Sequence, residues 1–302
     1  MNQTIKNRLV LGTAQIGMQY GIANKTGQPD SLNAETIIKE AWNGGIQEFD
    51  TAQAYGESEK VLGNAFDNLN IKHSAKVITK FSPNLNHNDE NEMRKSILTS
   101  LNKLGIDKLH GILLHKEEYL NYWYEGLGDT LIGFRSEGLV EHLGVSVSNP
   151  GFVKMALEEK DITIIQVPSN ILDRRFEQAG IFNKAEEKKK TIYIRSVFLQ
   201  GLLLLDPDKL FKSMEFTYNV LKKFNMLAEQ CGLSRQQLAI GFVMKAYQAA
   251  KIILGAETSR QVRANLSVLE SIDKVSDDIV DEARNLFKDV GDNILNPALW
   301  PN

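Results

Sequence analysis

Eight short apolar runs alternate with amphipathic helical patterns along almost the whole chain, and this alternation constrains the fold more than any other feature. Two parallel strands need a connection of a dozen or more residues, which is usually a helix. The alternation therefore predicts a parallel sheet covered by helices. The runs are Arg8 to Gly12, Ile46 to Thr51, Lys76 to Phe81, Leu109 to His115, His142 to Val147, Ile162 to Val167, Thr191 to Val197 and Lys251 to Gly255.

The number of strands and the chain length distinguish two kinds of parallel sheet. A doubly wound open sheet also alternates strands with helices, so the alternation alone does not exclude it. Eight strand–helix units within 302 residues, without a second block of different composition, favour the closed barrel. We expect a (β/α)8 TIM barrel in a single domain over residues 1–302, with a core from about residue 8 to residue 272.

One helical pattern has recognisable signals at both ends. Asp89 and Glu92 have the spacing of a capping box at its start. Gly105 can end the helix in the left-handed conformation, which glycine adopts without strain. We therefore expect one helix between these residues. Its predicted buried face consists of Met93, Ile97, Leu101 and Leu104.

Two segments interrupt the regular alternation. Ser213 to Gly232 lies between the seventh and eighth strands, ahead of the helix that the alternation requires, and we expect a helical insertion on the rim of the barrel. Asp273 to Asn302 is predicted to form a further helix and an irregular tail, with Ile279, Ala283 and Leu286 on one apolar face. Either segment can cover a substrate.

The charge balance argues against two classes of partner. The chain has 35 Lys and Arg against 38 Asp and Glu, which gives a formal net charge of -3. It therefore has no basic surplus to neutralise the phosphates of a nucleic acid or to bind an anionic membrane, and we expect neither partner. A small-molecule ligand is the better expectation.

The cysteine content limits the covalent and metal chemistry. Cys231 is the only cysteine, which excludes an intramolecular disulfide and a zinc site built on paired cysteines, and we predict no metal in the site. The first residues contain no apolar run of signal-peptide length, and the later apolar runs are strand-sized. We therefore expect a cytoplasmic protein without a membrane-spanning segment.

Four chemically active side chains follow three successive predicted strands. Asp50 ends the second strand and Tyr55 lies in the turn after it, Lys80 ends the third strand, and His115 ends the fourth. The carboxyl ends of barrel strands meet at one mouth, so we expect these side chains to converge. An ammonium beside a phenol stabilises the phenolate, a carboxylate keeps the ammonium charged, and an imidazole can orient a carbonyl oxygen or share a proton. Together they can polarise a carbonyl group.

The stretch from Asp50 to Gly63, DTAQAYGESEKVLG, resembles the signature of the aldo-keto reductase superfamily. Lys80 and His115 fall where that family keeps its other two catalytic residues, and the resemblance covers nearly the whole chain. It implies a tetrad of Asp50, Tyr55, Lys80 and His115, with Tyr55 as the general acid toward a carbonyl during hydride transfer from a nicotinamide. Taken separately, Asp50 is as well explained as a strand-end cap and Tyr55 as a packed aromatic residue. The joint match favours the catalytic interpretation.

The resemblance also implies a binding site for the nicotinamide. Gly12 and Thr13 follow the first strand where the family has its Gly-Thr pair beside the nicotinamide. Gln166 matches the glutamine that binds the carboxamide, and Ser146 fits the family pattern after the fifth strand. Val147 stands where the family has an asparagine, so its side chain cannot make the amide contact.

After the seventh strand the chain departs from the usual pattern of the family. Many members place an aromatic residue there that stacks on the nicotinamide, whereas this chain has Arg195, followed by Ser196 and Phe198. A guanidinium is planar and can stack too, so we interpret Arg195 as a variant of the stacking residue. Pairing of Arg195 with an acid of the rim insertion is the alternative. Gly201 lies in a stretch that resembles the pyrophosphate loop of the family, although a simple turn would also explain this glycine.

The stretch from Ile253 to Leu266 resembles the adenosine site of the family. NADP-preferring members often have a basic residue there to pair with the 2′-phosphate, whereas Glu257 offers a carboxylate, which repels a phosphate. Arg260 or Arg263 can compensate. The family resemblance favours NADP(H) as the cofactor, with NAD(H) as the alternative. The positions that it implies for this half of the cofactor are Gly255, Glu257, Gln261 and Asn265.

These features predict an oxidoreductase that reduces an aldehyde or a ketone, and its expected substrate is a small carbonyl compound or a sugar-like molecule. One alternative is an NAD-dependent dehydrogenase that oxidises a sugar hydroxyl with the same four residues. The other is a nicotinamide-sensing module that acts through a partner without catalysis. The sequence leaves open the oligomeric state and the choice of substrate-lining loops, because Glu117 to Leu127, Ser213 to Gly232 and the tail from Asn293 all carry aromatic residues.

Overall fold

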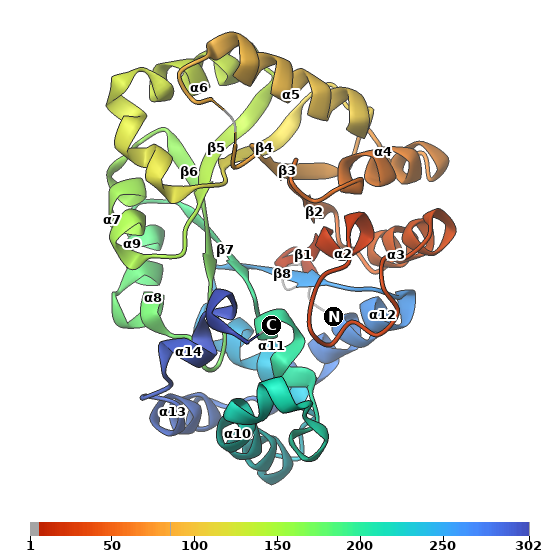
Figure 1. Ribbon diagram of the computed structural model, residues 1–302, viewed down its shortest axis with the longest axis vertical. Coiled ribbons are helices and arrows are strands. Elements are labelled where there is room, and N and C mark those ends of the chain that lie inside the picture. The colour runs from red at the N-terminus through yellow and green to blue at the C-terminus, as the bar shows by residue number, and fades with distance from the viewer. Residues whose placement is uncertain (1–5, 85, 302) are drawn as a thin grey trace.

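Eight parallel strands close into a barrel in the computed structural model, which describes residues 6–84 and 86–301. Each strand pairs with its neighbours in sequence, and β8 pairs with β1 to complete the ring (Figure 1). The predicted (β/α)8 barrel is confirmed, and all eight predicted strands are present with their ends shifted by at most two residues. The strands are β1 (Leu9–Gly12), β2 (Glu48–Asp50), β3 (Lys76–Lys80), β4 (Leu109–Leu114), β5 (Val140–Ser146), β6 (Ile162–Pro168), β7 (Thr191–Arg195) and β8 (Lys251–Gly255).

The strands are apolar on both faces because both faces are covered. Side chains such as Phe49 and Val77 point outward and belong to a large core between the sheet and the helices. Near-continuous apolar strands are what a parallel sheet buried on both faces requires. A separate, smaller cluster fills the barrel interior and consists of Val10, Ile78, Leu113, Ile164, Tyr193 and Ile253.

Helices surround the barrel and cover its outer face (Figure 1). The α-helices are α2 (Ala14–Gly17), α3 (Ser31–Asn43), α4 (Ser58–Asn68), α5 (Glu90–Leu104), α6 (Leu127–Ser136), α7 (Pro150–Glu158), α8 (Arg175–Gln178), α9 (Ile181–Glu187), α10 (Tyr218–Gln230), α11 (Arg235–Ala246), α12 (Ser259–Ser267), α13 (Asp277–Leu286) and α14 (Asp292–Leu295). The 3-10 helices are η1 (Glu117–Glu125), η2 (Leu199–Leu204), η3 (Pro207–Lys209), η4 (Lys212–Thr217), η5 (Val268–Lys274) and η6 (Pro297–Leu299).

The signals at the two ends of α5 are confirmed except for one half of the capping box. The Asp89 side chain accepts a hydrogen bond from the Glu92 backbone N–H at 3.0 Å, and Gly105 ends the helix at φ 64°. The Glu92 carboxylate does not return this bond to Asp89. It accepts instead from the backbone N–H of Asn86 at 3.5 Å. The predicted apolar face is buried.

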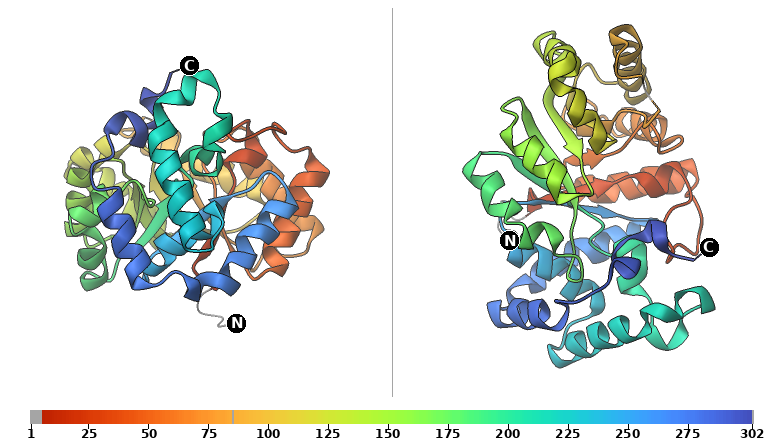
Figure 2. Two further views of the ribbon diagram at one scale, coloured as in Figure 1. Left: turned by 90° about the horizontal axis from the view of Figure 1, so that it is seen from below. Right: turned by 60° about the vertical axis from the view of Figure 1, so that its left-hand side comes forward.

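The two additional segments lie at the same end of the molecule, where α10 and α13 are neighbours in Figure 1 and Figure 2. The predicted rim insertion is helical and contains η4 and α10. On α13 the predicted apolar face is correct for Ala283, which is buried, and for Ile279, which packs partly buried against the core, but it is wrong for Leu286, which is 36% exposed. The buried residues are Val280, Ala283 and Phe287, since the large ring of Phe287 reaches the core from the residue that ends the helix.

Every helix in the described part of the chain is too short or too polar to span a lipid bilayer. The sequence also predicts that the first residues form no signal peptide. Residues 1–5 of that segment lie outside the described part of the chain.

Candidate active site

An ion pair between Asp50 and Lys80 is buried at the carboxyl ends of β2 and β3. The Lys80 ammonium donates to both carboxylate oxygens of Asp50, at 2.8 and 2.9 Å, and to the Thr51 carbonyl at 2.9 Å. The two side chains are 1% and 5% exposed. Burial by itself would lower the pKa of Lys80, but the charges of Asp50 and Tyr55 outweigh it and raise the pKa above its ordinary value. Lys80 is therefore held as an ammonium at neutral pH.

Tyr55 lies next to this ion pair. The Lys80 Nζ atom is 5.0 Å from the centroid of the Tyr55 ring, and the His115 ring packs edge-on against the same ring with centroids 6.2 Å apart. The turn that carries Tyr55 is braced against α2, where the Glu57 N–H donates to the Gly17 carbonyl at 3.3 Å. A side chain at Gly17 would lie 2.0 Å from the Tyr55 carbonyl oxygen, so this close approach requires glycine. The structure thus brings together all four predicted catalytic residues.

His115 is a neutral imidazole at physiological pH. Burial, and then the positive charge of Lys80, lower the pKa of His115 to about 4. Its Nδ1 atom is buried and has no hydrogen-bond partner within the described residues. A neutral imidazole carries one N–H donor, so it can donate a hydrogen bond to a carbonyl oxygen without adding a second positive charge beside Lys80.

Gln166 and Ser146 form a layer beneath Asp50. The Gln166 side-chain amide donates to Asp50 Oδ1 at 2.7 Å, and the Ser146 hydroxyl donates to the side-chain oxygen of Gln166 at 3.5 Å. Gln166 is fully buried. The family resemblance assigned both residues to the nicotinamide, and that assignment stays a prediction. In this structure their polar groups orient the Asp50 carboxylate.

The Thr13 side chain supports the backbone of Asp50. Its hydroxyl donates to the Asp50 carbonyl at 2.9 Å, and the Ser58 hydroxyl lies 2.8 Å from the Thr13 hydroxyl. Thr51 completes the buried network, since its hydroxyl donates to Ser58 at 2.9 Å. This network fixes the turn in which Tyr55 sits, because buried hydroxyls with satisfied partners are costly to displace.

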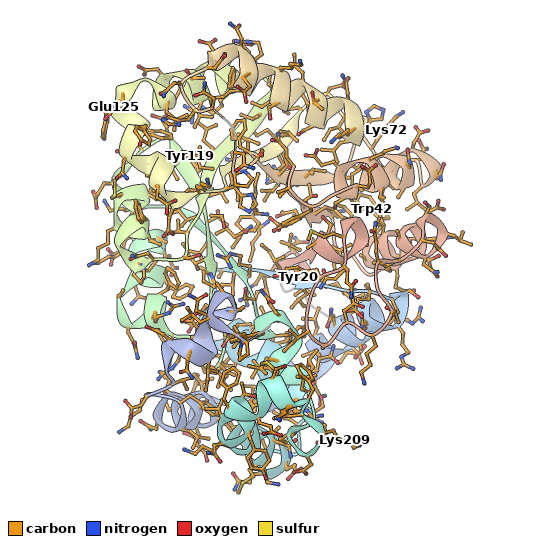
Figure 3. The ribbon with its side chains drawn as sticks, in the orientation of Figure 1. Tyr20, Trp42, Lys72, Tyr119, Glu125 and Lys209 are labelled. Carbon is orange, nitrogen blue, oxygen red and sulfur yellow. The ribbon has the colours of Figure 1, made fainter. Side chains whose placement is uncertain are left out.

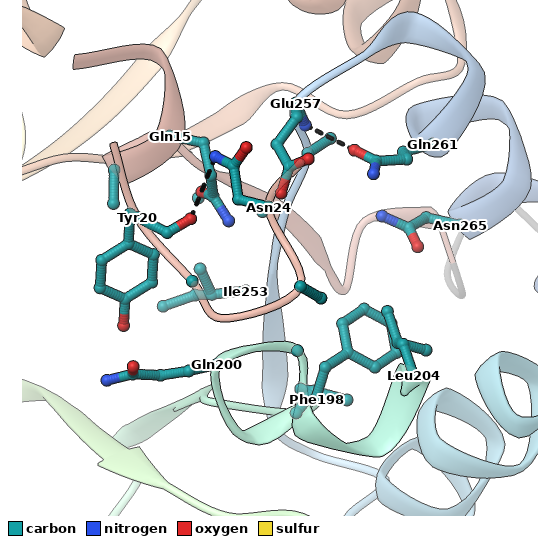
Figure 4. Close-up of a pocket in the computed structure, with 18 of the residues that line it drawn as sticks. Gln15, Tyr20, Asn24, Phe198, Gln200, Leu204, Ile253, Glu257, Gln261 and Asn265 are labelled. Atoms are coloured by element: carbon teal, nitrogen blue, oxygen red, sulfur yellow. Dashed lines mark hydrogen bonds between the residues drawn. The ribbon is translucent and has the colours of Figure 1, made fainter. Parts of the chain in front are cut away.

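A cavity of about 330 Å³ opens beside Asp50 and Tyr55, and we call it the barrel-mouth cavity. Figure 4 shows Tyr20 and Gln200 on one side of it and Gln261 and Asn265 on the other. Lys80, His115, Ser146 and Gln166 do not line it. Ten of the twelve predicted cofactor residues do: Gly12, Thr13, Arg195, Ser196, Phe198, Gly201, Gly255, Glu257, Gln261 and Asn265.

The loop after β1 crosses to the loop after β7 and closes one side of the cavity. The Ile22 N–H donates to the Gln200 carbonyl at 3.0 Å. Gly201 has φ 94°, and a side chain there would lie 2.6 Å from the Ala23 side chain. Ser196 and Gln200 also have positive φ, at 60° and 54°, so the loop after β7 is strained at residues that are not glycine.

Tyr20 and Asn24 are lining residues that sequence reasoning missed. Tyr20 lies near the middle of the molecule in Figure 3, far from the peripheral Lys72 and Lys209. Burial, and then Tyr55, raise the pKa of Tyr20. The Asn24 side chain accepts from the Gly27 N–H at 2.8 Å, and this turn holds the loop. The Asn-x-x-Gly spacing predicts a turn but not where the turn packs.

Arg195 lines the cavity without an acidic partner. Its guanidinium donates to the Ser148 hydroxyl at 2.9 Å and to the Ser196 hydroxyl at 3.5 Å. Across residues 6–84 and 86–301, no carboxylate lies within 4.0 Å of it. The alternative in which Arg195 pairs with an acid of the rim insertion is therefore not observed in the described part of the chain.

The far end of the cavity is formed by the N-terminus of α12. The Gln261 side chain accepts from the Glu257 N–H at 2.6 Å and completes a capping box with Thr258. Burial raises the pKa of Glu257, and Gln261 partly offsets this. Arg260 lines the cavity, whereas Arg263 does not and pairs with Glu40 at 2.6 Å. Of the two arginines that the sequence suggested as partners of a 2′-phosphate, Arg260 is therefore the one that lines the cavity.

The residues present fit a dinucleotide. The cavity joins the Tyr55 phenol at one end to amide side chains and a helix N-terminus at the other. Gly12 and Gly255 face each other across β1 and β8, and a side chain at Gly255 would lie 2.5 Å from the Gln15 amide, so the cavity wall there is bare backbone. Backbone N–H groups and a helix N-terminus are suited to bind anionic oxygens such as those of a pyrophosphate.

Comparison with known proteins gives a consistent result. The family model described as the aldo/keto reductase family matches residues 8–286. An NADH-specific methylglyoxal reductase of Escherichia coli is 24% identical over 302 residues, covering 87% of this chain and 90% of that protein. A putative voltage-gated potassium channel subunit beta of Schizosaccharomyces pombe is 24% identical, with 85% of each chain covered. The holo form of an aldo-keto reductase from Bacillus halodurans has the same fold, with a TM-score of 0.75, 20% identity and coverage of 96% and 95%.

Proposed function

The chain belongs to the aldo/keto reductase family of NAD(P)-dependent oxidoreductases, and from this premise we propose that it reduces an aldehyde or ketone to an alcohol with Tyr55 as the general acid. The observation that carries the proposal is the buried Asp50–Lys80 ion pair beside a tyrosine that opens into the barrel-mouth cavity. The substrate is a small carbonyl compound or a sugar-like molecule.

The proton reaches the carbonyl oxygen from the Tyr55 hydroxyl. The nicotinamide cofactor supplies the hydride when it is bound. The Lys80 ammonium, 5.0 Å from the centre of the ring, stabilises the phenolate that remains after proton transfer. Asp50 keeps Lys80 charged and in place through two hydrogen bonds. A positioned general acid contributes about 10²- to 10⁴-fold to a rate.

His115 orients the carbonyl. Its lowered pKa makes it neutral at physiological pH, so it donates a hydrogen bond and does not compete with Tyr55 as the acid. Gln166 holds the far side of the Asp50 carboxylate, and its contact at 2.7 Å prevents the carboxylate from rotating away from Lys80.

NADP(H) is the cofactor that we propose, with Arg260 as the partner of the 2′-phosphate. Arg260 lines the cavity, and no carboxylate of the described residues forms an ion pair with it. Glu257 in the same cavity opposes a phosphate, which keeps NAD(H) as the alternative. Glu257 also favours the second candidate function, an NAD-dependent dehydrogenase that oxidises a sugar hydroxyl with Tyr55 as the base.

The experiment that tests the proposed function is a titration of NADPH and NADH against the protein, followed by protein fluorescence, and then a screen of carbonyl compounds with the tighter cofactor. Binding and turnover of a carbonyl support the reductase. Turnover of sugar alcohols or aldoses with NAD⁺ alone supports the dehydrogenase. Binding of neither cofactor defeats both, and binding without turnover of any compound supports a non-catalytic nicotinamide sensor.

A further inference from the structure

The catalytic end of the barrel-mouth cavity carries one positive charge that nothing in the described chain neutralises. Arg195 ends β7 and is held by two neutral groups, the hydroxyls of Ser148 and Ser196. No carboxylate of residues 6–84 and 86–301 comes within 4.0 Å of its guanidinium. Hydroxyls position a guanidinium but do not cancel its charge.

The other charged groups nearby already have partners or are neutral. The charge of Lys80 is balanced by Asp50 at 2.8 Å. His115 is neutral at physiological pH. The field of Arg195 reaches this group of residues, because its charge opposes protonation of both Lys80 and His115. Glu257 lines the same cavity but forms no ion pair with Arg195.

The total charge of the site is the same before and after carbonyl reduction, because the hydride and the proton both stay within it. The positive charge of Arg195 is therefore still without a partner from the chain. A guanidinium in a partly buried site attracts an anionic group, and this attraction is strongest where water is excluded. A substrate that brings a negative charge offsets the charge of Arg195, while a neutral substrate does not.

We propose that the substrate carries an anionic group close to the reacting carbonyl and that Arg195 binds this group. The proposal rests on the reductase function proposed above and names its substrate class. A guanidinium presents a planar fork of N–H donors that matches the oxygens of a carboxylate or a phosphate. Ser148 and Ser196 take one donor each and leave the others of the fork to a ligand. Arg195 is then a residue for substrate specificity.

The interpretation of Arg195 as a residue that stacks on the nicotinamide predicts a different result. A stacking residue contributes to cofactor affinity and is indifferent to the charge of the substrate. A residue that binds an anionic substituent changes the selectivity between charged and neutral substrates and leaves the cofactor affinity nearly unaltered. The two roles are therefore separated by measuring both quantities in the same variant.

The test uses pairs of carbonyl compounds that differ in one charge. Pyruvate against methyl pyruvate examines a carboxylate, and glyceraldehyde 3-phosphate against glyceraldehyde examines a phosphate. The quantity measured is the ratio of kcat/KM for the charged to the neutral member, in the full-length protein with saturating cofactor. We expect a ratio above one for at least one pair, and the pair that shows it identifies the anion.

Arg195→Gln removes the charge and Arg195→Lys keeps it without the planar fork. We expect the ratio to fall by about tenfold or more in Arg195→Gln, the factor that one charge-assisted hydrogen bond contributes, and to fall less in Arg195→Lys. Lys209→Gln removes one positive charge from an exposed side chain outside the cavity and should leave the ratio unchanged. High salt should reduce the ratio in the unmodified protein.

Each possible result tests a different part of the proposal. A ratio of one or less for both pairs, with the neutral members reduced, overturns the anionic substrate and leaves the proposed function intact. Weaker cofactor binding in Arg195→Gln with an unchanged ratio assigns Arg195 to the nicotinamide. This result also overturns the proposal that Arg195 binds an anionic group of the substrate. Absence of turnover for every carbonyl defeats the proposed function itself. Thermal unfolding and cofactor titration of both variants show whether they are folded.

Discussion

Lys80 Nζ lies 2.8 Å from Asp50 Oδ1, and the barrel wall leaves both side chains almost without contact to water. A buried pair of this kind is weak evidence for stability, because taking two ions out of water costs about as much as their attraction returns. It is stronger evidence for function, since the ammonium is fixed beside the Tyr55 phenol, which lines the barrel-mouth cavity together with Asp50.

Removal of one partner of this pair is expected to destabilise the fold. Asp50→Asn leaves the Lys80 ammonium buried without a counter-charge, and such a loss costs about 3–5 kcal/mol. Urea unfolding at neutral pH measures it. The double variant Asp50→Asn with Lys80→Met should recover part of the lost free energy, because no uncompensated charge remains. Equal stability of Asp50→Asn and the unmodified protein would show that the ion pair has no structural role.

The Asp50–Lys80 pair also makes the stability of the fold depend on pH in the alkaline range. The pKa of Lys80 is raised in the folded state above its ordinary value of 10.5. Its contribution to stability is therefore fully present below pH 10.5 and is lost as the pH rises through the folded-state pKa. Unfolding midpoints measured from pH 10 to 12 should fall more steeply in the unmodified protein than in the double variant, which lacks the titrating group.

His115 makes the stability of the fold depend on pH in the acid range, with the opposite sign. Its pKa is about 4 in the folded state against 6.5 for a free imidazole. Between these values the unfolded chain binds a proton that the folded protein does not, so stability is complete above pH 6.5 and declines as the pH falls toward 4. The loss of stability between pH 7 and pH 5 should be smaller in His115→Asn. An identical loss in both proteins would contradict the lowered pKa.

Glu257 and Arg260 are expected to act in opposite directions on cofactor choice. Arg260→Gln removes the cation proposed to pair with the 2′-phosphate and should weaken NADPH binding more than NADH binding. Glu257→Gln removes a repulsive carboxylate and should strengthen NADPH binding. Dissociation constants for both cofactors in both variants measure this. If Arg260→Gln changes the two constants equally, the 2′-phosphate has another partner.

The contact between the loops after β1 and β7 is expected to depend on Gly201. Gly201→Ala places a methyl group against Ala23, at a backbone conformation that alanine adopts only with strain. Gly180→Ala is the matched control, because Gly180 also has positive φ, at 69°, but has open space around it. Gly180→Ala should lose about 1 kcal/mol of stability through backbone strain alone, and Gly201→Ala should lose more because of the added contact with Ala23. Only Gly201→Ala should also weaken cofactor binding, as measured by fluorescence titration.

The sequence predicted those parts of the fold and the site that depend on local pattern. The eight strands follow from the alternation of apolar runs with helices, and the closed ring follows from their number. Asp50, Lys80 and His115 could be placed at one mouth because each one ends a parallel strand or follows it directly. The structure brings them together with Tyr55, as expected.

The parts that could not be predicted depend on contacts between distant segments. Tyr20 enters the cavity because Ile22 pairs with Gln200, and no local pattern encodes a bond between those loops. The buried face of α13 was misassigned because periodicity gives the spacing of apolar residues but not the rotation of the helix on the core, where Phe287 outweighs Leu286. The cytoplasmic location stays a prediction.

The measurement that tests the central claim most directly is the turnover of Tyr55→Phe together with its cofactor affinity. The substitution removes one hydroxyl and keeps the ring that packs against His115 and Lys80. If Tyr55 is the general acid, kcat should fall by about 10²- to 10⁴-fold or more while the dissociation constant of the cofactor changes little. Turnover close to that of the unmodified protein would contradict the proposed role of Tyr55.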